Sequence, residues 1–565
     1  MPSQIQYDTV EGVEMVPGTI KIIDLLQTMN VKHMEGSKSD IVLVPQPTRD
    51  PNDPLNWSRW RKEYHYWLLW WWGFIAAVSV NWVGPVWTQL TIDYNTTYYQ
   101  LNVASGLCWL FLGLGCVFLQ PTAMKIGRRP VYLMATVFNL VGCAMGGVSK
   151  SIGIFYGVNI LTGIGAAPVD SLVEISTMDI FFAHERGTRL SLLLFTIYAG
   201  SYLGPVAAGY VAESQTWRWC YWYLVIFLFG LLVIQLFTME ESTYRRPISS
   251  VEIGGVPASA HTKTKELEAG HDKHATTTIA SDEDEIPIPP PKTYMQRFSL
   301  IQTSQNDPRS WIVIALRPFA LITYPAVMWG GIVYGVQVMW LSLLATTQSE
   351  IFSSPPYNFS VVNVGNINFA AFIGGTLGMF WGGMVSDKCL LYLARRNGGI
   401  AEPEMRLWTM LLPAFINTGG LLMYGLGAYY EMHWILSAGF GTACIAFGIG
   451  SGGAIAITYA VDCYTLVASE ALVLMLFVRN LFGMGFTFAI QPWLAADGLK
   501  ATSIIMSMIC LVSNLSFLGM VFFGKRMRKW TAGSPNQVYY WQVSDNVPGR
   551  NPLTLPCFLS AEPLP

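Results

Sequence analysis

Two acidic residues, Asp170 and Glu174, stand four positions apart inside a long apolar run of the chain. In a helix this spacing places both carboxylates on one face, one turn apart. Ionisable groups at membrane depth are costly, so they usually face a cavity and carry function. Burial favours the protonated form of such a group, whereas an approaching cation favours the ionised form. We therefore expect this pair to exchange a proton for a cationic substrate.

The sequence leaves open the roles of the charged residues that lie inside apolar runs. Glu174 lies near Asp179 and His184, close to the end of its apolar run, where it could be a solvated structural acid. Arg479 is a further charge near the middle of another apolar run. It could neutralise Asp170 or Glu174, bind an anionic substrate, or form a purely structural ion pair.

Aromatic and amide side chains inside the apolar runs are candidates for the walls of a substrate cavity. An aromatic face attracts an organic cation by cation–π contact. Most Trp and Tyr residues of a membrane protein instead anchor it at the interface or pack its helices. The candidates for the cavity wall are Asn81, Trp82, Tyr198, Tyr202, Tyr334, Gln337, Trp340 and Tyr459.

Long apolar runs must position these side chains. About twelve of them reach, or nearly reach, the roughly 17 to 25 residues that a helix needs to cross a bilayer. Only 12% of the 565 residues are charged, against about 25% in soluble proteins. The chain is therefore predicted to be an all-α membrane protein with about twelve transmembrane helices. The runs are Trp67–Trp87, Ser105–Pro121, Val131–Val148, Ile152–Val173, Leu190–Ala212, Trp219–Phe237, Phe319–Leu344, Val364–Val385, Leu407–Tyr429, Trp434–Ala460, Leu472–Trp493 and Ser503–Phe523.

Composition and motifs also limit the partners and cofactors. The formal net charge of −2 indicates no nucleic-acid partner. The nine cysteines show no CxxC or other metal-ligand spacing, so we expect no metal and no other cofactor. We find no HExxH, Ser-His-Asp or Cys-His set at the end of an apolar run, and no nucleotide-binding motif. The sequence therefore predicts a protein that is not an enzyme and is driven by an ion gradient.

Lys and Arg residues cluster on alternate connections between the apolar runs. The other short connections hold only Lys150, Arg218 and Lys500. Because positive residues favour the cytosolic side, both termini are expected in the cytosol. Glycosylation sequons at Asn95 and Asn358 fall on predicted outer loops. We expect a multi-pass protein of the plasma membrane, with no cleaved signal peptide.

A polar segment interrupts the apolar runs once, with an acidic cluster and a proline tract. Such a segment cannot bury a core and is expected to be a mostly disordered cytosolic linker. Two blocks of helices around such a loop are typical of transporters that bind substrate near the midplane. The predicted parts are an N-terminal tail (1–66), a six-helix bundle (67–240), the linker (241–316), a second six-helix bundle (317–524) and a C-terminal tail (525–565).

Several blocks of residues resemble the major facilitator superfamily. Met124–Pro130 and Gly383–Lys388 look like two copies of its inner-loop motif, and Gly200–Gly209 looks like the signature of its proton-coupled antiporter branch. The strings DPLNWSRWRK, DIFFAHERG and ARRNGGIAEPEMRL resemble the fungal drug:proton antiporter-1 group. That group includes cycloheximide-resistance pumps and a yeast polyamine and histidinol carrier. The resemblance covers Asp53 to about Phe523 and implies the major facilitator fold, with two pseudo-symmetric six-helix bundles.

The resemblance assigns roles to the matching residues. It implies an inner-loop gate of Lys125, Gly127, Arg128, Arg129, Gly383, Asp387 and Lys388, although ordinary topology-setting charge is an alternative for the two arginines. The antiporter-like motif is Gly200, Gly204, Pro205 and Gly209, expected to pack against a helix of the other half. Two positions depart from the family. Met124 stands where an acid forms a charge latch, which is then missing or moved to Asp387, and Asn159 replaces an arginine of many relatives.

These observations predict a secondary active transporter for a small organic, cationic substrate, either polyamine-like or a drug or metabolite. It would work as a monomer, by proton-coupled alternating access. One alternative is a proton-driven efflux pump for drugs or secondary metabolites. A lower-ranked alternative is a nutrient sensor that kept the carrier fold. Import and export both remain open.

Overall fold

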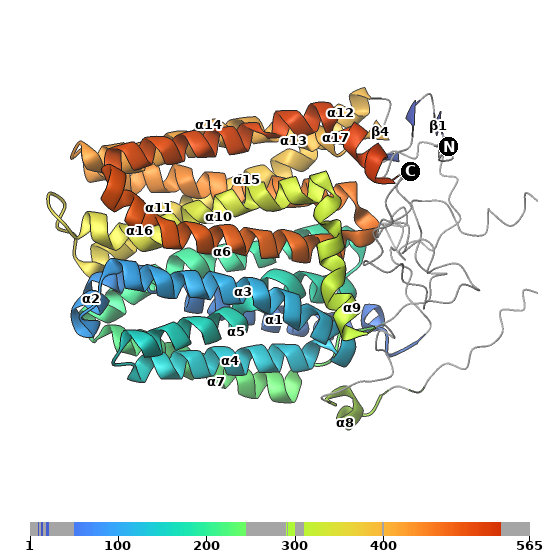
Figure 1. Cartoon of the computed structure of the whole chain (residues 1–565). Helices are drawn as coiled ribbons and strands as arrows, with labels where there is room; N and C mark the ends of the chain where they lie inside the picture. Colours follow the sequence, from blue (N-terminus) through green and yellow to red (C-terminus); the bar gives the residue numbers. More distant parts are fainter. Residues whose placement is uncertain are drawn as a thin grey trace, which may run out of the picture.

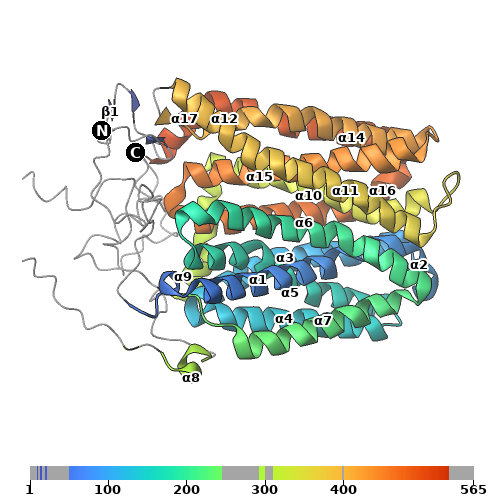
Figure 2. The ribbon, with the colours of Figure 1, turned by 180° about the vertical axis from the view of Figure 1, so that it is seen from behind.

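Two bundles of long helices lie side by side in the structure, a computed structural model. It describes residues 9–10, 13–14, 19–21, 50–244, 290, 292–299, 310–397 and 400–532. In Figure 1 the bundle built from α1 to α7 is coloured blue to green, and the bundle built from α10 to α17 is yellow to red. Figure 2 shows from behind that the helices of both bundles run roughly along one direction.

The first bundle contains seven helices and one 3-10 turn within the described residues. The chain enters it through the short 3-10 turn Pro54–Asn56, where the Asp53 carboxylate accepts a hydrogen bond from the Leu55 amide at 3.0 Å. Such a side-chain cap satisfies an amide that the helix itself leaves free. The elements are α1 (Arg59–Asn81), the 3-10 turn η2 (Gly84–Val86), α2 (Trp87–Tyr94), α3 (Tyr98–Ile126), α4 (Arg128–Val148), α5 (Ile152–Ile180), α6 (Ala183–Ser214) and α7 (Trp217–Thr238).

The second bundle follows two short helices, α8 (Tyr294–Arg297) and α9 (Trp311–Leu316). Pro325 stands at the start of its first long helix, where a missing amide hydrogen costs nothing. Its elements are η6 (Arg317–Thr323), α10 (Pro325–Phe352), α11 (Val361–Phe380), the π-turn η7 (Trp381–Val385), α12 (Ser386–Arg396), α13 (Glu404–Leu407), η8 (Trp408–Met410), α14 (Leu411–Tyr429), the π-turn η9 (Ile435–Gly441), α15 (Thr442–Cys463), η10 (Thr465–Val467), α16 (Ala468–Leu515) and α17 (Phe517–Ala532).

Strands are short among the described residues. β1 (Thr9–Val10) pairs antiparallel with β2 (Val13–Glu14). β3 (Ile20–Lys21) pairs antiparallel with β4 (Ile400–Ala401), so a piece of the N-terminal segment lies against the second bundle. The predicted all-α membrane architecture is therefore confirmed, with two small ladders added at one end.

Ten stretches of the described helices are long and apolar enough to cross a membrane. Two of the expected runs follow one another without a loop, because the chain turns between them at Gly498 of α16, where φ is +70°, and the second run continues into α17. The first expected run begins in α1, which is outside those ten, and continues through η2 to the start of α2. These two differences account for the gap between ten and the predicted number of about twelve. Most of the predicted tails and linker lies outside the described residues, so the part boundaries stay predictions.

The most extensive contacts between the bundles are made by two pairs of helices. α3 of the first bundle packs on α16 of the second, and α6 packs on α11. Each bundle also has its own buried apolar clusters, for example around Trp72 in the first and Tyr459 in the second. The end at which α1 begins and α17 ends is called the terminus end below; α2 and the loop between α10 and α11 lie at the opposite end (Figure 1).

Candidate functional site

A cavity of about 970 Å³, part of it open to solvent, lies between the two bundles. Helices α1, α3, α5 and α6 of the first bundle and α10, α15 and α16 of the second line it. Its wall is mostly aliphatic, with residues such as Val80, Leu112, Ile197, Leu341 and Leu476. Seven predicted site residues meet there: Asn81, Asp170, Glu174, Tyr198, Tyr202, Tyr334 and Arg479.

A buried ion pair crosses this cavity from one bundle to the other. Arg479 of α16 pairs with Asp170 of α5 through both of its terminal nitrogens, and the Nη1 to Oδ1 distance is 3.4 Å. The two side chains are 6% and 13% exposed. Charged groups this deep require partners, because an unpaired buried charge is strongly destabilising. The structure therefore gives Arg479 the partner that the sequence left undecided.

Two neighbours hold the Arg479 guanidinium in place. Nη1 donates to the Tyr334 hydroxyl at 2.8 Å, and Nη2 donates to Oδ1 of Asn480 at 3.0 Å. The guanidinium carbon also lies 4.9 Å from the centre of the Tyr334 ring, within cation–π range. The ion pair, the hydrogen bonds and the cation–π contact thus hold Arg479 against Asp170. Arg479 is the one cationic side chain among the described residues of the cavity wall.

Glu174 lies one helical turn from Asp170, nearer the terminus end, and lines the same cavity. No hydrogen bond or ion pair joins its carboxylate to another residue in the described part of the chain. Its side chain is half-buried. The two acids of α5 therefore differ in their surroundings, since one is paired across the bundle interface and the other faces the cavity.

Polar groups on α1 and α6 also border the cavity. The Asn81 amide donates to Oγ of Ser201 at 3.1 Å, which links α1 to α6. The Tyr198 hydroxyl donates to the Ile449 carbonyl at 3.4 Å, a contact between the bundles. The buried Tyr202 hydroxyl has no hydrogen-bond partner among the described residues. These groups can meet the polar parts of a bound molecule.

Four aromatic or amide candidates do not line this cavity in the structure. Gln337 donates to Asn514 at 2.8 Å and accepts from Asn417 at 2.7 Å, in a buried amide chain within the second bundle. The other three side chains are at most 1% exposed and pack on neighbouring rings: Trp82 on Tyr221, Trp340 on Phe486 and Tyr459 on Trp329. The structure gives these four side chains packing contacts within a bundle.

The first inner-loop motif forms a tight, capped helix junction at the terminus end. Gly127 separates α3 from α4 with φ at +105°, a conformation that favours glycine. The Glu241 carboxylate accepts hydrogen bonds from the Arg128 and Arg129 amides at 2.9 and 3.0 Å, so it caps α4. Lys125 precedes this junction on the last turn of α3.

The two arginine side chains of this motif are both paired. Arg128 forms an ion pair with Asp179 at the end of α5. Arg129 is 2% exposed and donates to the Leu236 and Phe298 carbonyls, the first at 2.7 Å. The capping role of Glu241 was missed from the sequence, because a lone acid after an apolar run looks like a solvated charge.

Asp387 of the second inner-loop motif is paired with an arginine that lies outside the motif. Arg406 donates to Asp387 at 2.6 Å and to Asp462 at 3.2 Å, so it joins α12, α13 and α15. Gly383 lies in the π-turn η7 with open space beside it. The Lys388 side chain is exposed. Asp387 is thus part of an ion-pair network at the terminus end.

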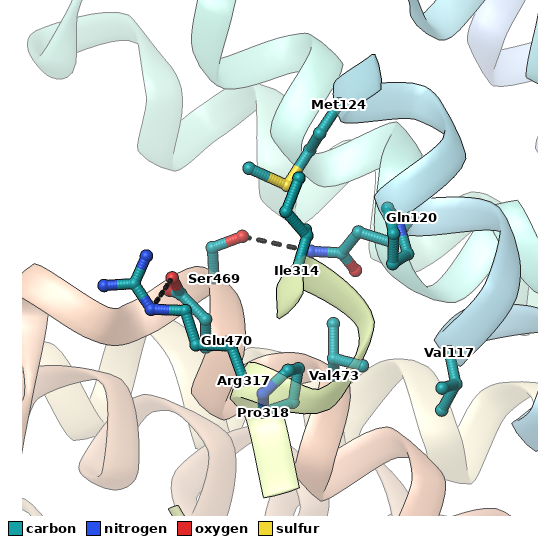
Figure 3. Close-up of a pocket in the computed structure, with 10 residues that line it drawn as sticks. Val117, Gln120, Met124, Ile314, Arg317, Pro318, Ser469, Glu470 and Val473 are labelled. Atoms are coloured by element: carbon teal, nitrogen blue, oxygen red, sulfur yellow. Dashed lines mark hydrogen bonds and ion pairs between the residues drawn. The ribbon is translucent and has the colours of Figure 1, made fainter. Parts of the chain in front are cut away.

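Another contact between the bundles lies near Met124 (Figure 3). Gln120 of α3 donates to Ser469 of α16 at 3.0 Å, and beside it, within the second bundle, Arg317 of η6 lies 3.6 Å from Glu470. Met124 lines a small cavity beside these groups, so a thioether occupies the position of the acid in the family motif. The polar contact between α3 and α16 here is made by Gln120 and Ser469.

The glycines of the antiporter-like motif pack in two directions. A side chain at Gly200 would meet the Phe74 carbonyl oxygen at 2.7 Å, and one at Gly204 would meet Val78 at 3.1 Å, so both pack on α1 of the same bundle. The expectation that they face the other half was wrong for these two. A side chain at Gly209, in contrast, would meet the Val361 carbonyl oxygen of α11 at 3.0 Å. Pro205 lies inside α6, and its carbonyl approaches Gly365 of α11.

The two sequon asparagines, Asn95 and Asn358, are exposed and have positive φ values. Asn95 ends α2, and Asn358 lies between α10 and α11. Both sites are therefore at the end opposite the terminus end (Figure 1). Their use for glycosylation stays a prediction.

Comparison with known proteins places the chain among transporters. The sequence profile of the Major Facilitator Superfamily matches residues 69–487. The chain is 32% identical to an uncharacterised MFS-type transporter of Schizosaccharomyces pombe, over 92% of this chain and 94% of that protein. It is 30% identical to the HOL1 protein of Saccharomyces cerevisiae, over 93% of this chain and 97% of that protein.

The fold is also found among solved structures. The xylose transporter XylE of E. coli, in a partially occluded inward-open conformation, matches with a TM-score of 0.54 over 81% of this chain and 99% of that one. The identity is 12%, so this likeness concerns the fold alone. The predicted fold class is confirmed. With a family profile matched along most of its length and fungal carriers as relatives, the chain belongs to the Major Facilitator Superfamily and is a secondary transporter of the fungal type.

Proposed function

We propose that this transporter moves a small organic cation by proton-coupled alternating access, with the acids of α5 as the binding site. The observation that carries the proposal is the place of Asp170 and Glu174, which line one cavity between the two bundles. A carboxylate in such a place can hold either a proton or a cation. Rocking of the bundles around it would expose the same group to each side in turn.

The walls of the cavity suit an organic cation. Aliphatic side chains line most of it, and the Tyr198, Tyr202 and Tyr334 rings offer aromatic faces. Apolar walls bind the carbon skeleton of a substrate, while a few polar groups fix its orientation. A polyamine-like cation and a cationic drug or metabolite both meet this description.

Proton-driven export of drugs or secondary metabolites is the second candidate. The feature that favours it is the antiporter-like motif in α6, with Pro205 and the close contact of Gly209 with α11. Export and uptake would use the same carboxylates and differ in the gradient that drives the cycle. A nutrient sensor that retained the carrier fold remains the lower-ranked candidate.

We further propose that the protein works as a monomer in the plasma membrane, with both termini in the cytosol. Positive residues at the terminus end support this orientation, among them Arg61, Arg129 and Arg528. Positive loops favour the cytosolic side. The two sequon asparagines at the opposite end would then face outward and accept glycans. Deglycosylation of the membrane-bound protein, read as a mobility shift, tests this arrangement.

The test of the proposed function replaces both acids of α5 with amides. Purified Asp170→Asn/Glu174→Gln protein is placed in vesicles, and cation uptake or efflux is measured across a range of pH. We expect the pH dependence of transport to vanish, because no ionisable group of the pair remains. Glu213→Gln, which alters an exposed acid at the end of α6, should keep it. Coupling that is unchanged in the double variant would refute the proposal.

A further inference from the structure

The charges at the cavity wall add up to a single uncompensated negative charge. Asp170, Glu174 and Arg479 are the lining residues, among those described, that have acidic or basic side chains, and this sum applies when Glu174 is ionised. The Arg479 guanidinium is held by Asp170, Tyr334 and Asn480. Its charge therefore offsets that of Asp170, and the carboxylate of Glu174 is left over.

The contacts distinguish a fixed pair from an exchangeable group. The pair has side chains that are 6% and 13% exposed, and it joins helices of different bundles. Removing either partner would leave a buried charge without compensation, so the pair is costly to open. Glu174 has no hydrogen bond or ion pair within the described residues, and it lines the open cavity. A proton or a cation can reach it without breaking an existing contact.

The titratable groups of neighbouring helices near the two acids do not alter this balance, and at the terminus end of α5 Asp179 is paired with Arg128. The helices packed on α5 bring Cys116 from α3, Tyr132 from α4 and Tyr198 and Tyr202 from α6, and α10 adds Tyr334. Thiols and phenols are neutral near pH 7. α1 lines the cavity with Ala76, Ala77, Val80 and Asn81, none of which titrates.

We propose that Glu174 alone exchanges, and that the site takes an organic cation of one positive charge against one proton. This rests on the proposed function and narrows it to cations of one charge, which excludes polyamines with two or more protonated amines, because a dication would leave one charge uncompensated in an apolar cavity. With either occupant the wall carries no net charge. The exchange therefore moves no net charge across the membrane. It follows the pH gradient, and the cation accumulates on the acidic side.

A matched pair of permanently charged probes tests the charge rule. Hexyltrimethylammonium carries one positive charge and hexamethonium carries two, on the same six-carbon chain, and neither can lose a proton. Binding to the full-length protein in detergent is measured by calorimetry. The wild type should bind hexyltrimethylammonium more tightly, by at least about tenfold. In Arg479→Gln the wall carries two negative charges, and the preference should reverse.

A second variant separates charge from folding. Asp170→Asn/Arg479→Gln removes both charges of the pair and leaves Glu174, so the wall again carries one negative charge. It should retain the preference for hexyltrimethylammonium, even where Arg479→Gln alone does not fold. Equal or tighter binding of hexamethonium to the wild type, or a reversed preference in the double variant, would overturn the charge rule.

Transport in proteoliposomes tests the absence of net charge movement. Hexyltrimethylammonium accumulation is driven by a fixed pH gradient, with the membrane potential either clamped at zero or set by potassium and valinomycin. A neutral exchange should give the same accumulation at every potential. A cycle that moves one charge should shift the accumulation about fifty-fold per 100 mV. Transport that follows the potential overturns the one-for-one exchange while the proposed function stands; failure of both probes to bind or move overturns both.

Discussion

Arg479 of α16 is paired with Asp170 of α5, and this ion pair joins the two bundles at the wall of the central cavity. Sequence separation gives no hint of it, since the two residues are 309 positions apart. The pair places a fixed neutral unit beside the free carboxylate of Glu174. Substrate selection and contact between the bundles therefore depend on the same few side chains.

Replacing one partner of this ion pair should destabilise the protein more than replacing both partners. Asp170→Asn leaves the Arg479 charge buried without its partner and should destabilise the protein by roughly 3–5 kcal/mol. Asp170→Asn/Arg479→Gln removes both charges and should regain most of that loss. Thermal unfolding in detergent, at matched protein and detergent concentrations, measures both. A double variant less stable than the single one would contradict the ion-pair interpretation.

The two inner-loop glycines should respond differently to the same substitution. Gly127 has φ at +105°, and an added side chain would meet Glu241, so Gly127→Ala should destabilise the protein by about 1–3 kcal/mol. Gly383 has nothing within 4 Å of an added side chain, so Gly383→Ala should be tolerated. Melting temperatures of the two variants compare them directly. A similar loss at both positions would mean that the junction at Gly127 imposes no special constraint.

Gln337 and Tyr334 lie on the same helix but should affect different properties. Gln337→Met leaves Asn514 and Asn417 without their amide partner and should reduce stability by about 1–3 kcal/mol. Cation binding should change little. Tyr334→Phe removes the hydroxyl that receives a hydrogen bond from Arg479 and should alter binding at the cavity. Titration with hexyltrimethylammonium and a melting curve for each variant separate the two effects. Weaker binding in Gln337→Met, with the stability unchanged, would mean that Gln337 belongs to the binding site.

Close packing between α6 and α11 should not tolerate a larger side chain. Gly209→Val would press against the Val361 carbonyl oxygen and the Gly365 backbone, at a cost of about 1–3 kcal/mol. Gly230→Val is the control, because nothing lies within 4 Å of a side chain added at Gly230 of α7. Transport rate and melting temperature are measured for both. Normal values in Gly209→Val would exclude a tight contact there.

Most of the fold could be predicted from the sequence because length and apolarity alone define a membrane-spanning helix. Most of each expected run lies in an observed helix, although Phe319–Leu344 crosses the boundary at Pro325, and Gly127 marks a boundary that its backbone chemistry requires. The short connection between two of the runs, within α16, was not predicted. It depends on the single turn at Gly498, which a sequence does not distinguish from a loop.

The candidate site could be predicted in part. Asp170 and Glu174 are close in sequence, so helix geometry alone places them together. The faces of Gln337, Trp340 and Tyr459 could not be assigned, because helices that are apolar all round carry no periodic pattern to show which side meets the cavity. Glu241 and Arg406 were missed as partners of the inner-loop motifs, since their contacts arise only when distant helix ends meet.

The most direct measurement is the number of protons released when a cation binds. Calorimetric titration of the wild type with hexyltrimethylammonium, in two buffers of different ionisation enthalpy at a pH where Glu174 is protonated, gives that number. We expect about one proton per bound cation for the wild type and about none for Glu174→Gln. Proton release that persists undiminished in Glu174→Gln would contradict the account, because the exchanged proton would then belong to another group.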